Sequence, residues 1–182
     1  MATIFSHPTI ALGLFPWFND VRNHKIILVT GALLTIAPDL DVLGLYAGIP
    51  YEHMLGHRGL SHSLLFAAFI AALTTWLFSR RLEIRASAVW LYLFISMASH
   101  GVLDALTNGG LGIAFLAPIS NERYFFAFRP IEVSTLNIRH FFDGQGAMVL
   151  ANEIVTIWPI CLAVLVIGIF WHKGRTDQPS KG

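Results

Sequence analysis

Charged side chains are scarce in this sequence. Asp, Glu, Lys and Arg make up 13% of the 182 residues, whereas an ordinary soluble domain carries about 25%. Hydrophobic residues reach 55% and the mean hydropathy is +0.62, so we predict an integral membrane protein. The formal net charge of +1 gives no support for a nucleic-acid partner. Cysteine is nearly absent: Cys161 stands alone in an apolar run, which excludes a disulfide framework and a cysteine-based zinc site.

The sequence also lacks the signs of a cleaved signal peptide. Its opening, MATIFSHPTIALGLFPWFNDVR, has no basic start, and a histidine and prolines interrupt the apolar run. We therefore expect this segment to remain in the folded protein.

Long apolar stretches dominate the rest of the chain. They cover residues 26–47, 64–78, 86–106 and 149–171, and a shorter one covers residues 8–18. A spanning helix needs about 20 mostly apolar residues, and the second stretch reaches that length only if its helix begins near Gly59. We predict an all-α polytopic membrane bundle with four spanning helices and a short, half-embedded N-terminal helix. Residues 1–172 would form one integral membrane domain, followed by a polar cytoplasmic tail at residues 173–182.

Lys and Arg indicate the orientation, because cytoplasmic loops of membrane proteins are enriched in both. The helices alternate without contradiction if three basic places face the cytoplasm, which puts residues 48–58 and 108–148 on the opposite side. Arginines within the second of these segments weaken the bias. The basic places are Arg22 with Lys25, then Arg80, Arg81 and Arg85, and finally Lys173, Arg175 and Lys181.

The ionisable residues of the apolar stretches share one level in this topology. They come from five separate segments, and all map toward the non-cytoplasmic end. An ionisable group inside a bilayer costs about 2.5–3.5 kcal/mol on insertion scales. Several at one depth must neutralise one another, as carboxylates and imidazoles do around a shared cation. The set is His7, Asp39, Asp41, His57, His62, His100, Asp104 and Glu153.

The chemistry of this set favours a metal. Histidine, aspartate and glutamate without cysteine suit zinc or a similar divalent ion in a catalytic rather than a structural site. His100 and Asp104 are four residues apart and share one side of a helix. Pro38 breaks its helix just before Asp39, which lets the following carboxylates point inward. We expect Zn²⁺, and the number of ligands is sufficient for two ions or more.

Each residue by itself also has a purely structural interpretation. Asp39 could cap a helix after a proline turn, and Asp39 and Asp41 could form a salt-bridge cluster with Arg58. His53 is as consistent with an interfacial turn as with a ligand. For the whole set at one level, a shared function explains the pattern better.

Five short motifs in a fixed order resemble a known family. They are His7, PDLD at residues 38–41, HRGLSHS at 57–63, SHGVLD at 99–104 and TNGG at 107–110. Together they resemble the YdjM-like family of bacterial inner-membrane proteins, which are described as metal-dependent hydrolases. FRPI at residues 128–131 extends the resemblance. The resemblance implies a polar core formed by Asp39, Asp41, His57, His62, His100 and Asp104, with His7 beside them.

That family is distantly similar to zinc-dependent phospholipase C and nuclease P1, which are all-helical enzymes with a cluster of metals. The pair His100-x-x-x-Asp104 matches their H-x-x-x-[DE] motif. The amino-terminal tryptophan ligand of those enzymes has no counterpart here, so the resemblance does not imply three metals.

The function that we expect is hydrolysis by a metal-activated water. Asp39 or Asp41 would bridge metals or orient the water, and Arg58 would donate two hydrogen bonds to a phosphate or carboxylate of the substrate. A site in the non-cytoplasmic leaflet of the bacterial inner membrane favours a phospholipid or another lipid phosphoester as substrate, with membrane lipids as partners. The alternatives are transport of protons or metal ions, and a metal with a purely structural role.

Overall fold

The computed structural model describes residues 1–18, 25–135 and 141–176. Every regular element in these ranges is helical, apart from isolated bridges that join Thr107 to Ile131 and Ile113 to Tyr124. The all-α prediction is therefore confirmed. The elements are α1 (His7–Leu14), η1 (Phe15–Trp17), α3 (Lys25–Leu34), η2 (Ala37–Asp41), α4 (Val42–Tyr46), η3 (Leu60–His62), α5 (Leu64–Ser79), α6 (Ala86–Ala105), the π-helix η4 (Phe141–Gln145), α8 (Gly146–Thr156) and α9 (Trp158–Thr176).

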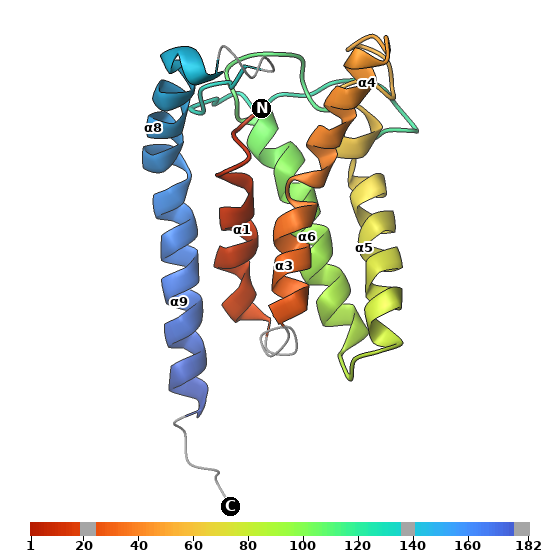
Figure 1. Ribbon diagram of the computed structural model, residues 1–182. Helices are drawn as coiled ribbons and strands as arrows, with labels where there is room; N and C mark the ends of the chain where they lie inside the picture. Colours follow the sequence, from red (N-terminus) through yellow and green to blue (C-terminus); the bar gives the residue numbers. More distant parts are fainter. Residues whose placement is uncertain (19–24, 136–140, 177–182) are drawn as a thin grey trace, which may run out of the picture.

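Three helices pack against one another in the middle of the bundle (Figure 1). Helix α1 contacts α3 and α6, and α3 contacts α6. Helix α5 packs on α6 at one flank, and α9 packs on α1 at the other. The start of α1, the end of α6 and the short helix α4 all lie at the upper end of Figure 1, which we call the polar end.

Fewer helices reach spanning length than the apolar stretches predict. Helix α6 has 20 residues, and Gly146–Trp171 has 26, and both are long and apolar enough to cross a membrane. A third candidate span counts only if Lys25–Leu34 and Ala37–Tyr46, bent by 44°, are taken together. The prediction of four spanning helices is thus reduced to two or three candidates, because α5 has 16 residues.

The bend in the third candidate span has a local cause. Pro38 has no amide hydrogen, and its ring disfavours a helical conformation in the residue before it. Helix α3 ends at Leu34, and the chain tightens into η2, where the Asp39 amide donates to the carbonyl of Ile36 at 3.1 Å. The tight turn carries Asp39 and Asp41 at the polar end of the bundle.

Helix α5 is short because it begins at Leu64, not near Gly59 as a spanning length would require. Ser63 has an extended backbone with ψ 152°, and its Oγ accepts a hydrogen bond from the amide of Phe66 at 3.1 Å. This is the geometry of a helix N-cap. Residues 57–62 therefore fold outside α5, as turns followed by the short 3-10 helix η3.

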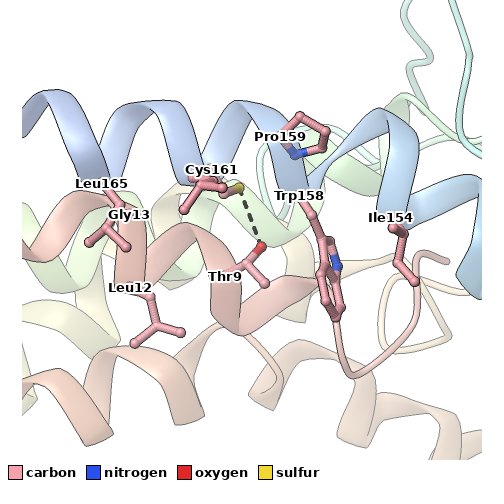
Figure 2. Close-up of a pocket in the computed structure, with 9 residues that line it drawn as sticks. Thr9, Leu12, Gly13, Ile154, Trp158, Pro159, Cys161 and Leu165 are labelled. Atoms are coloured by element: carbon pink, nitrogen blue, oxygen red, sulfur yellow. Dashed lines mark hydrogen bonds between the residues drawn. The ribbon is translucent and has the colours of Figure 1, made fainter.

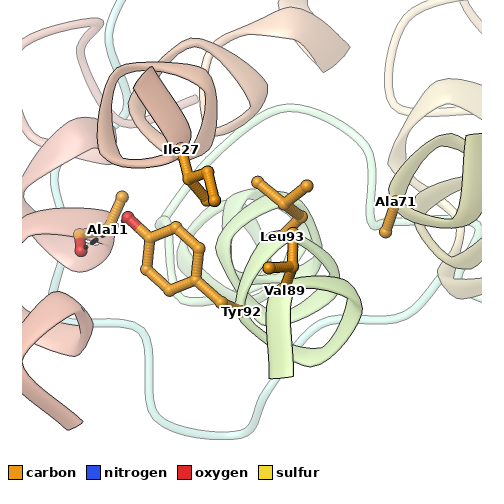
Figure 3. Close-up of a cluster of buried hydrophobic side chains, with 6 residues drawn as sticks. All are labelled: Ala11, Ile27, Ala71, Val89, Tyr92 and Leu93. Atoms are coloured by element: carbon orange, nitrogen blue, oxygen red, sulfur yellow. Dashed lines mark hydrogen bonds between the residues drawn. The ribbon is translucent and has the colours of Figure 1, made fainter. Parts of the chain in front are cut away.

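Apolar packing holds the opposite half of the bundle together (Figure 3). Tyr92 of α6 is fully buried with Ala11 of α1 and Ile27 of α3. Its hydroxyl donates to the carbonyl of Ala11 at 3.1 Å, so the polar tip of the side chain is satisfied. Gly31 allows the close approach of α3, because a Cβ there would lie 2.6 Å from the Tyr92 ring.

Helix α9 packs on α1 through small and apolar residues (Figure 2). The Thr9 hydroxyl points at Cys161 Sγ, 3.3 Å away. A Cβ on Gly13 would lie 3.0 Å from the carbonyl oxygen of Cys161, so the two helices nearly touch there. Beside this contact is an apolar groove of about 380 Å³, which we call the α1–α9 groove.

The described residues include only part of the predicted polar tail, and they do not include every basic residue that indicates the orientation. Helix α9 runs to Thr176, so residues 173–176, the start of the predicted polar tail, are helical. Residues 177–182 and Arg22 lie outside the described residues. The single membrane domain, the half-embedded position of α1 and the cytoplasmic side of the tail stay predictions.

Candidate metal centre

Four side chains from three elements, η2, η3 and α6, meet at the polar end of the bundle. Their ligand atoms all lie within 4.8 Å of one another, which is close enough to share a metal ion. His62 Nε2 is 3.0 Å from His100 Nε2, and His100 Nε2 is 3.3 Å from Asp39 Oδ1. Asp104 Oδ2 lies 3.9 Å from His62 Nε2 and 4.0 Å from His100 Nε2. Tetrahedral zinc ligands are about 3.4 Å apart, so this group, the four-ligand cluster, has the spacing of a metal site.

The second ring nitrogen of each histidine in the cluster is oriented by a hydrogen-bond acceptor. His100 Nδ1 lies 2.7 Å from the carbonyl oxygen of Thr35, which can only accept. His62 Nδ1 lies 3.1 Å from Asp41 Oδ2. Such contacts to a backbone carbonyl or a carboxylate fix the tautomer of a metal-binding histidine and leave Nε2 with its lone pair. The cluster therefore has the supporting contacts that metal sites require.

Asp41 lies behind the cluster and joins several polar groups. Its Oδ1 is 2.6 Å from His57 Nδ1, and its Oδ2 accepts hydrogen bonds from the Arg58 amide at 3.1 Å and from Ser61 Oγ. Asp41, His57 and His62 also form a second group whose atoms could hold a metal. Both oxygens of Asp41 already contact protein groups, so its geometry favours a role in orienting His57 and His62 over direct binding of a metal.

His7 is the remaining histidine at this level. Its ring stacks on His100 with centroids 3.9 Å apart, and its Nε2 lies 3.8 Å from Asp104 Oδ1. The side chain is fully buried, and neither ring nitrogen has a hydrogen-bond partner among the described residues. An unsatisfied buried imidazole is costly, so His7 is available for a ligand or a proton.

Arg58 is bound internally on every side of its guanidinium. Nε lies 3.2 Å from Asp104 Oδ2, Nη1 donates to the carbonyls of Gly109 and Leu111, and Nη2 donates to Thr107 Oγ1. The side chain is fully buried, and the residue has a positive φ of 64°. These contacts favour a role in fixing Asp104 and the turn at residues 107–111, rather than the predicted contact with a substrate.

Glu153 is buried at the same end but engages a different partner. Its carboxylate accepts hydrogen bonds from the amide and hydroxyl of Thr3 and from Ser6 Oγ, the last at 2.6 Å. It belongs to neither candidate metal group within the described residues. Its contacts tie the N-terminal segment to α8. His53 is exposed and accepts a hydrogen bond from the amide of Leu55 at 3.1 Å, apart from the cluster.

The pKa of His62 is determined mainly by its burial. Burial lowers the pKa of His62, while its hydrogen bond to Asp41 opposes that effect. The imidazole is therefore neutral at neutral pH, the form in which histidine binds metals.

The comparisons with known proteins find the family that the sequence motifs resemble. The family model of the YdjM inner membrane protein matches residues 1–175. The inner membrane protein YbcI of Escherichia coli (strain K12) is 30% identical over 175 residues, which cover 96% of this chain and all of that protein. The chain belongs to the YdjM family. The predicted family is thus confirmed, and the YdjM family is one of inner membrane proteins; the leaflet that holds the polar end stays a prediction. No solved structure matches the chain.

Some supporting residues of this YdjM-family site were not predicted. Thr35 supplies a backbone carbonyl, which side-chain chemistry does not reveal, although it lies one helical turn before Asp39. Ser61 stands inside HRGLSHS, but its contact with Asp41 depends on a turn that sequence spacing did not predict. Thr3 and Ser6 bond to Glu153 across 150 and 147 positions, a separation for which no local pattern gives a signal.

Proposed function

We propose that this protein is a membrane-embedded, metal-dependent hydrolase, and that Asp39, His62, His100 and Asp104 hold its divalent cation. The observation that carries the proposal is the 3.0 Å approach of the Nε2 atoms of His62 and His100. Each Nδ1 faces an acceptor, so where both rings are neutral each keeps its hydrogen there and directs an Nε2 lone pair at the other ring. Two facing lone pairs repel unless they share a cation.

The charge of the site supports the same conclusion. Three carboxylates, those of Asp39, Asp41 and Asp104, lie among the histidines of the site, and one guanidinium, that of Arg58, pairs with Asp104. Where the histidines are neutral, the carboxylates outnumber the guanidinium in this buried region, and such charges require partners. A divalent cation supplies the missing charge and suits carboxylate and imidazole ligands.

The residues divide the chemistry among them. A divalent cation bound there would act as a Lewis acid and would lower the pKa of a water toward neutrality. Asp39 has two oxygens without hydrogen-bond partners among the described residues, so one can bind the cation and the other can take a proton from the water. Asp41 and the Thr35 carbonyl orient the two histidines, and Arg58 holds Asp104. His7 is a further candidate ligand, or a donor of a proton to the leaving group.

A lipid phosphoester is the substrate that fits best. The cluster lies in a protein of an inner-membrane family, and an apolar pocket lined by Asp39 opens next to it. Transport of ions is less well supported. Every buried histidine, carboxylate and guanidinium of the described residues lies at the polar end, whereas the other half has the apolar core of Figure 3.

Turnover by purified protein in lipid nanodiscs tests this proposal. We expect hydrolysis of a fluorogenic phospholipid, its loss on chelation, and its recovery with Zn²⁺ or another divalent ion. His100→Ala should lower turnover by more than about 100-fold, the upper end of what loss of a mere supporting contact costs. His53→Ala, an exposed histidine outside the cluster, is the matched control. Ion flux in liposomes without any hydrolysis would contradict the proposal.

A further inference from the structure

A second groove opens at the polar end, between the N-terminal segment, η2 with α4, and the chain around η4. Its volume is about 470 Å³, within the range of about 300–1,000 Å³ of small-molecule sites. We call it the Asp39 groove. Its lining residues include Phe5, Leu40, Leu43, Tyr46, Phe141 and Phe142.

Asp39 is the one charged side chain among the residues that line this groove. Its side chain is 9% exposed, and neither carboxylate oxygen has a hydrogen-bond partner among the described residues. The same carboxylate belongs to the four-ligand cluster, with Oδ1 at 3.3 Å from His100 Nε2. The walls of the groove are therefore mostly apolar, and the groove meets the candidate metal centre at Asp39.

The walls of the groove are open to the surroundings of the protein. Tyr46 and Phe142 are 76% and 79% exposed, and Leu43 is 64% exposed. Large apolar side chains gathered around a groove with one carboxylate fit a ligand that has an apolar body and a polar end. For a protein of an inner-membrane family, the surrounding bilayer is the source of such molecules.

The α1–α9 groove of Figure 2 provides the contrast. It is apolar and of comparable volume, about 380 Å³, but none of its lining residues is charged. A lipid chain in it would meet no charged side chain. The combination of apolar walls and an unpartnered buried carboxylate distinguishes the Asp39 groove.

Building on the hydrolase proposed above, we infer that the Asp39 groove binds the hydrocarbon chain of a membrane lipid and places the lipid's polar end at Asp39. The N-terminal segment, α4 and the residues around η4 then determine which lipid reaches the cluster. The chain lies along Leu43 and Phe142, and the ester or phosphoester group meets the site from the side of Asp39.

Photo-crosslinking in liposomes tests this inference. Full-length protein is reconstituted with a phospholipid that carries a diazirine in its acyl chain, illuminated, and mapped by peptide mass spectrometry. We expect crosslinks concentrated on residues 1–5, 40–46 and 141–142. Crosslinks spread uniformly over the exposed faces of α5 and α9, with no excess in the Asp39 groove, would overturn the inference. This comparison uses the wild-type protein alone.

Two matched substitutions sharpen the test. Leu43→Trp fills the Asp39 groove, whereas Leu12→Trp fills the α1–α9 groove, and both positions are exposed apolar sites. We expect Leu43→Trp to reduce crosslinking in the Asp39 groove and lipid turnover each by at least about 10-fold, with an unchanged content of bound metal, since the variant leaves the four ligands in place. Leu12→Trp should change neither.

The outcomes separate this inference from the proposed function. If metal binds and lipid is hydrolysed, but Leu43→Trp changes neither crosslinking nor turnover, the groove inference fails and the hydrolase stands. If crosslinks concentrate in the groove while the protein binds no metal, the groove is a lipid site and the proposed function fails.

Discussion

The two halves of this bundle are built from the same helices but with opposite chemistry. Helix α6 contributes Val89 and Leu93 to the apolar core and His100 and Asp104 to the polar end. Helix α1 likewise contributes Ala11 to the core, yet it begins at the buried His7. Because no change of helix separates the halves, the difference lies in the side chains and in the turns that end the helices.

The comparison shows which half stabilises the fold and which half carries a cost. Burial of apolar side chains is favourable at roughly 25 cal/mol per Å². Burial of carboxylates and imidazoles is unfavourable unless they are paired. At the polar end several carboxylate and imidazole atoms have no hydrogen-bond partner among the described residues, whereas elsewhere in them the unpartnered buried side-chain atoms are only the neutral hydroxyls of Thr75 and Ser96. This contrast indicates that the polar end is organised for a ligand.

The largest expected effect comes from the residue that holds the polar end together. Arg58→Met removes the partner of Asp104 and leaves the carbonyls of Gly109 and Leu111 unpaired. Breaking a buried ion pair costs about 3–5 kcal/mol, and the free energy of unfolding in detergent should fall by that amount.

Arg80→Met is the matched control for that variant. Arg80 is exposed and lies over the Trp76 ring at 3.9 Å. Its loss should cost less than about 1 kcal/mol. Equal effects of the two variants would show that Arg58 has no special structural role.

Asp41→Asn tests the contacts behind the four-ligand cluster. The amide keeps the size of the side chain but no longer offers two charged acceptors to His57 and His62. Loss of such an orienting carboxylate typically lowers metal affinity about 10–100-fold, which competition with a chelator of known affinity measures. Glu122→Gln, at an exposed carboxylate, should leave the affinity unchanged. A complete loss of binding would instead make Asp41 a ligand itself.

Gly31→Ala tests the apolar half. The added Cβ would lie 2.6 Å from the Tyr92 ring, and overpacking of this kind costs about 1–3 kcal/mol. We expect a lower unfolding free energy with an unchanged metal content. Gly44→Ala is the control, because the nearest atom to its Cβ is 3.4 Å away. Loss of metal in Gly31→Ala would show that the halves are coupled.

The smallest effect is expected between α1 and α9. Thr9→Val removes the hydroxyl's contact with Cys161 Sγ and its hydrogen bond to the carbonyl of Ser6 within the same segment, and retains the shape of the side chain. Hydrogen bonds between membrane helices average about 0.6 kcal/mol, so the unfolding free energy should fall by about that amount. A loss several times larger would mean that this contact anchors α9.

The sequence predicts much of this arrangement because it depends on local rules. The i, i+4 spacing of His100 and Asp104 and the break at Pro38 put both elements of the site at one end, where the structure has them. Helix α5 does not begin near Gly59, as the predicted spanning length requires, because the cap at Ser63 outweighs the helical tendency of the residues before it. The contacts of Arg58 and Glu153 depend on turns and on partners distant in sequence, which no local pattern describes.

The metal content of the purified protein tests the central claim most directly. Inductively coupled plasma mass spectrometry of the wild-type chain should find at least about one divalent ion per chain. The variant His62→Ala/His100→Ala should retain less than about a tenth of that amount, while His53→Ala retains all of it. A folded wild-type chain that carries no divalent ion, and takes up none when Zn²⁺ is supplied, would contradict the account.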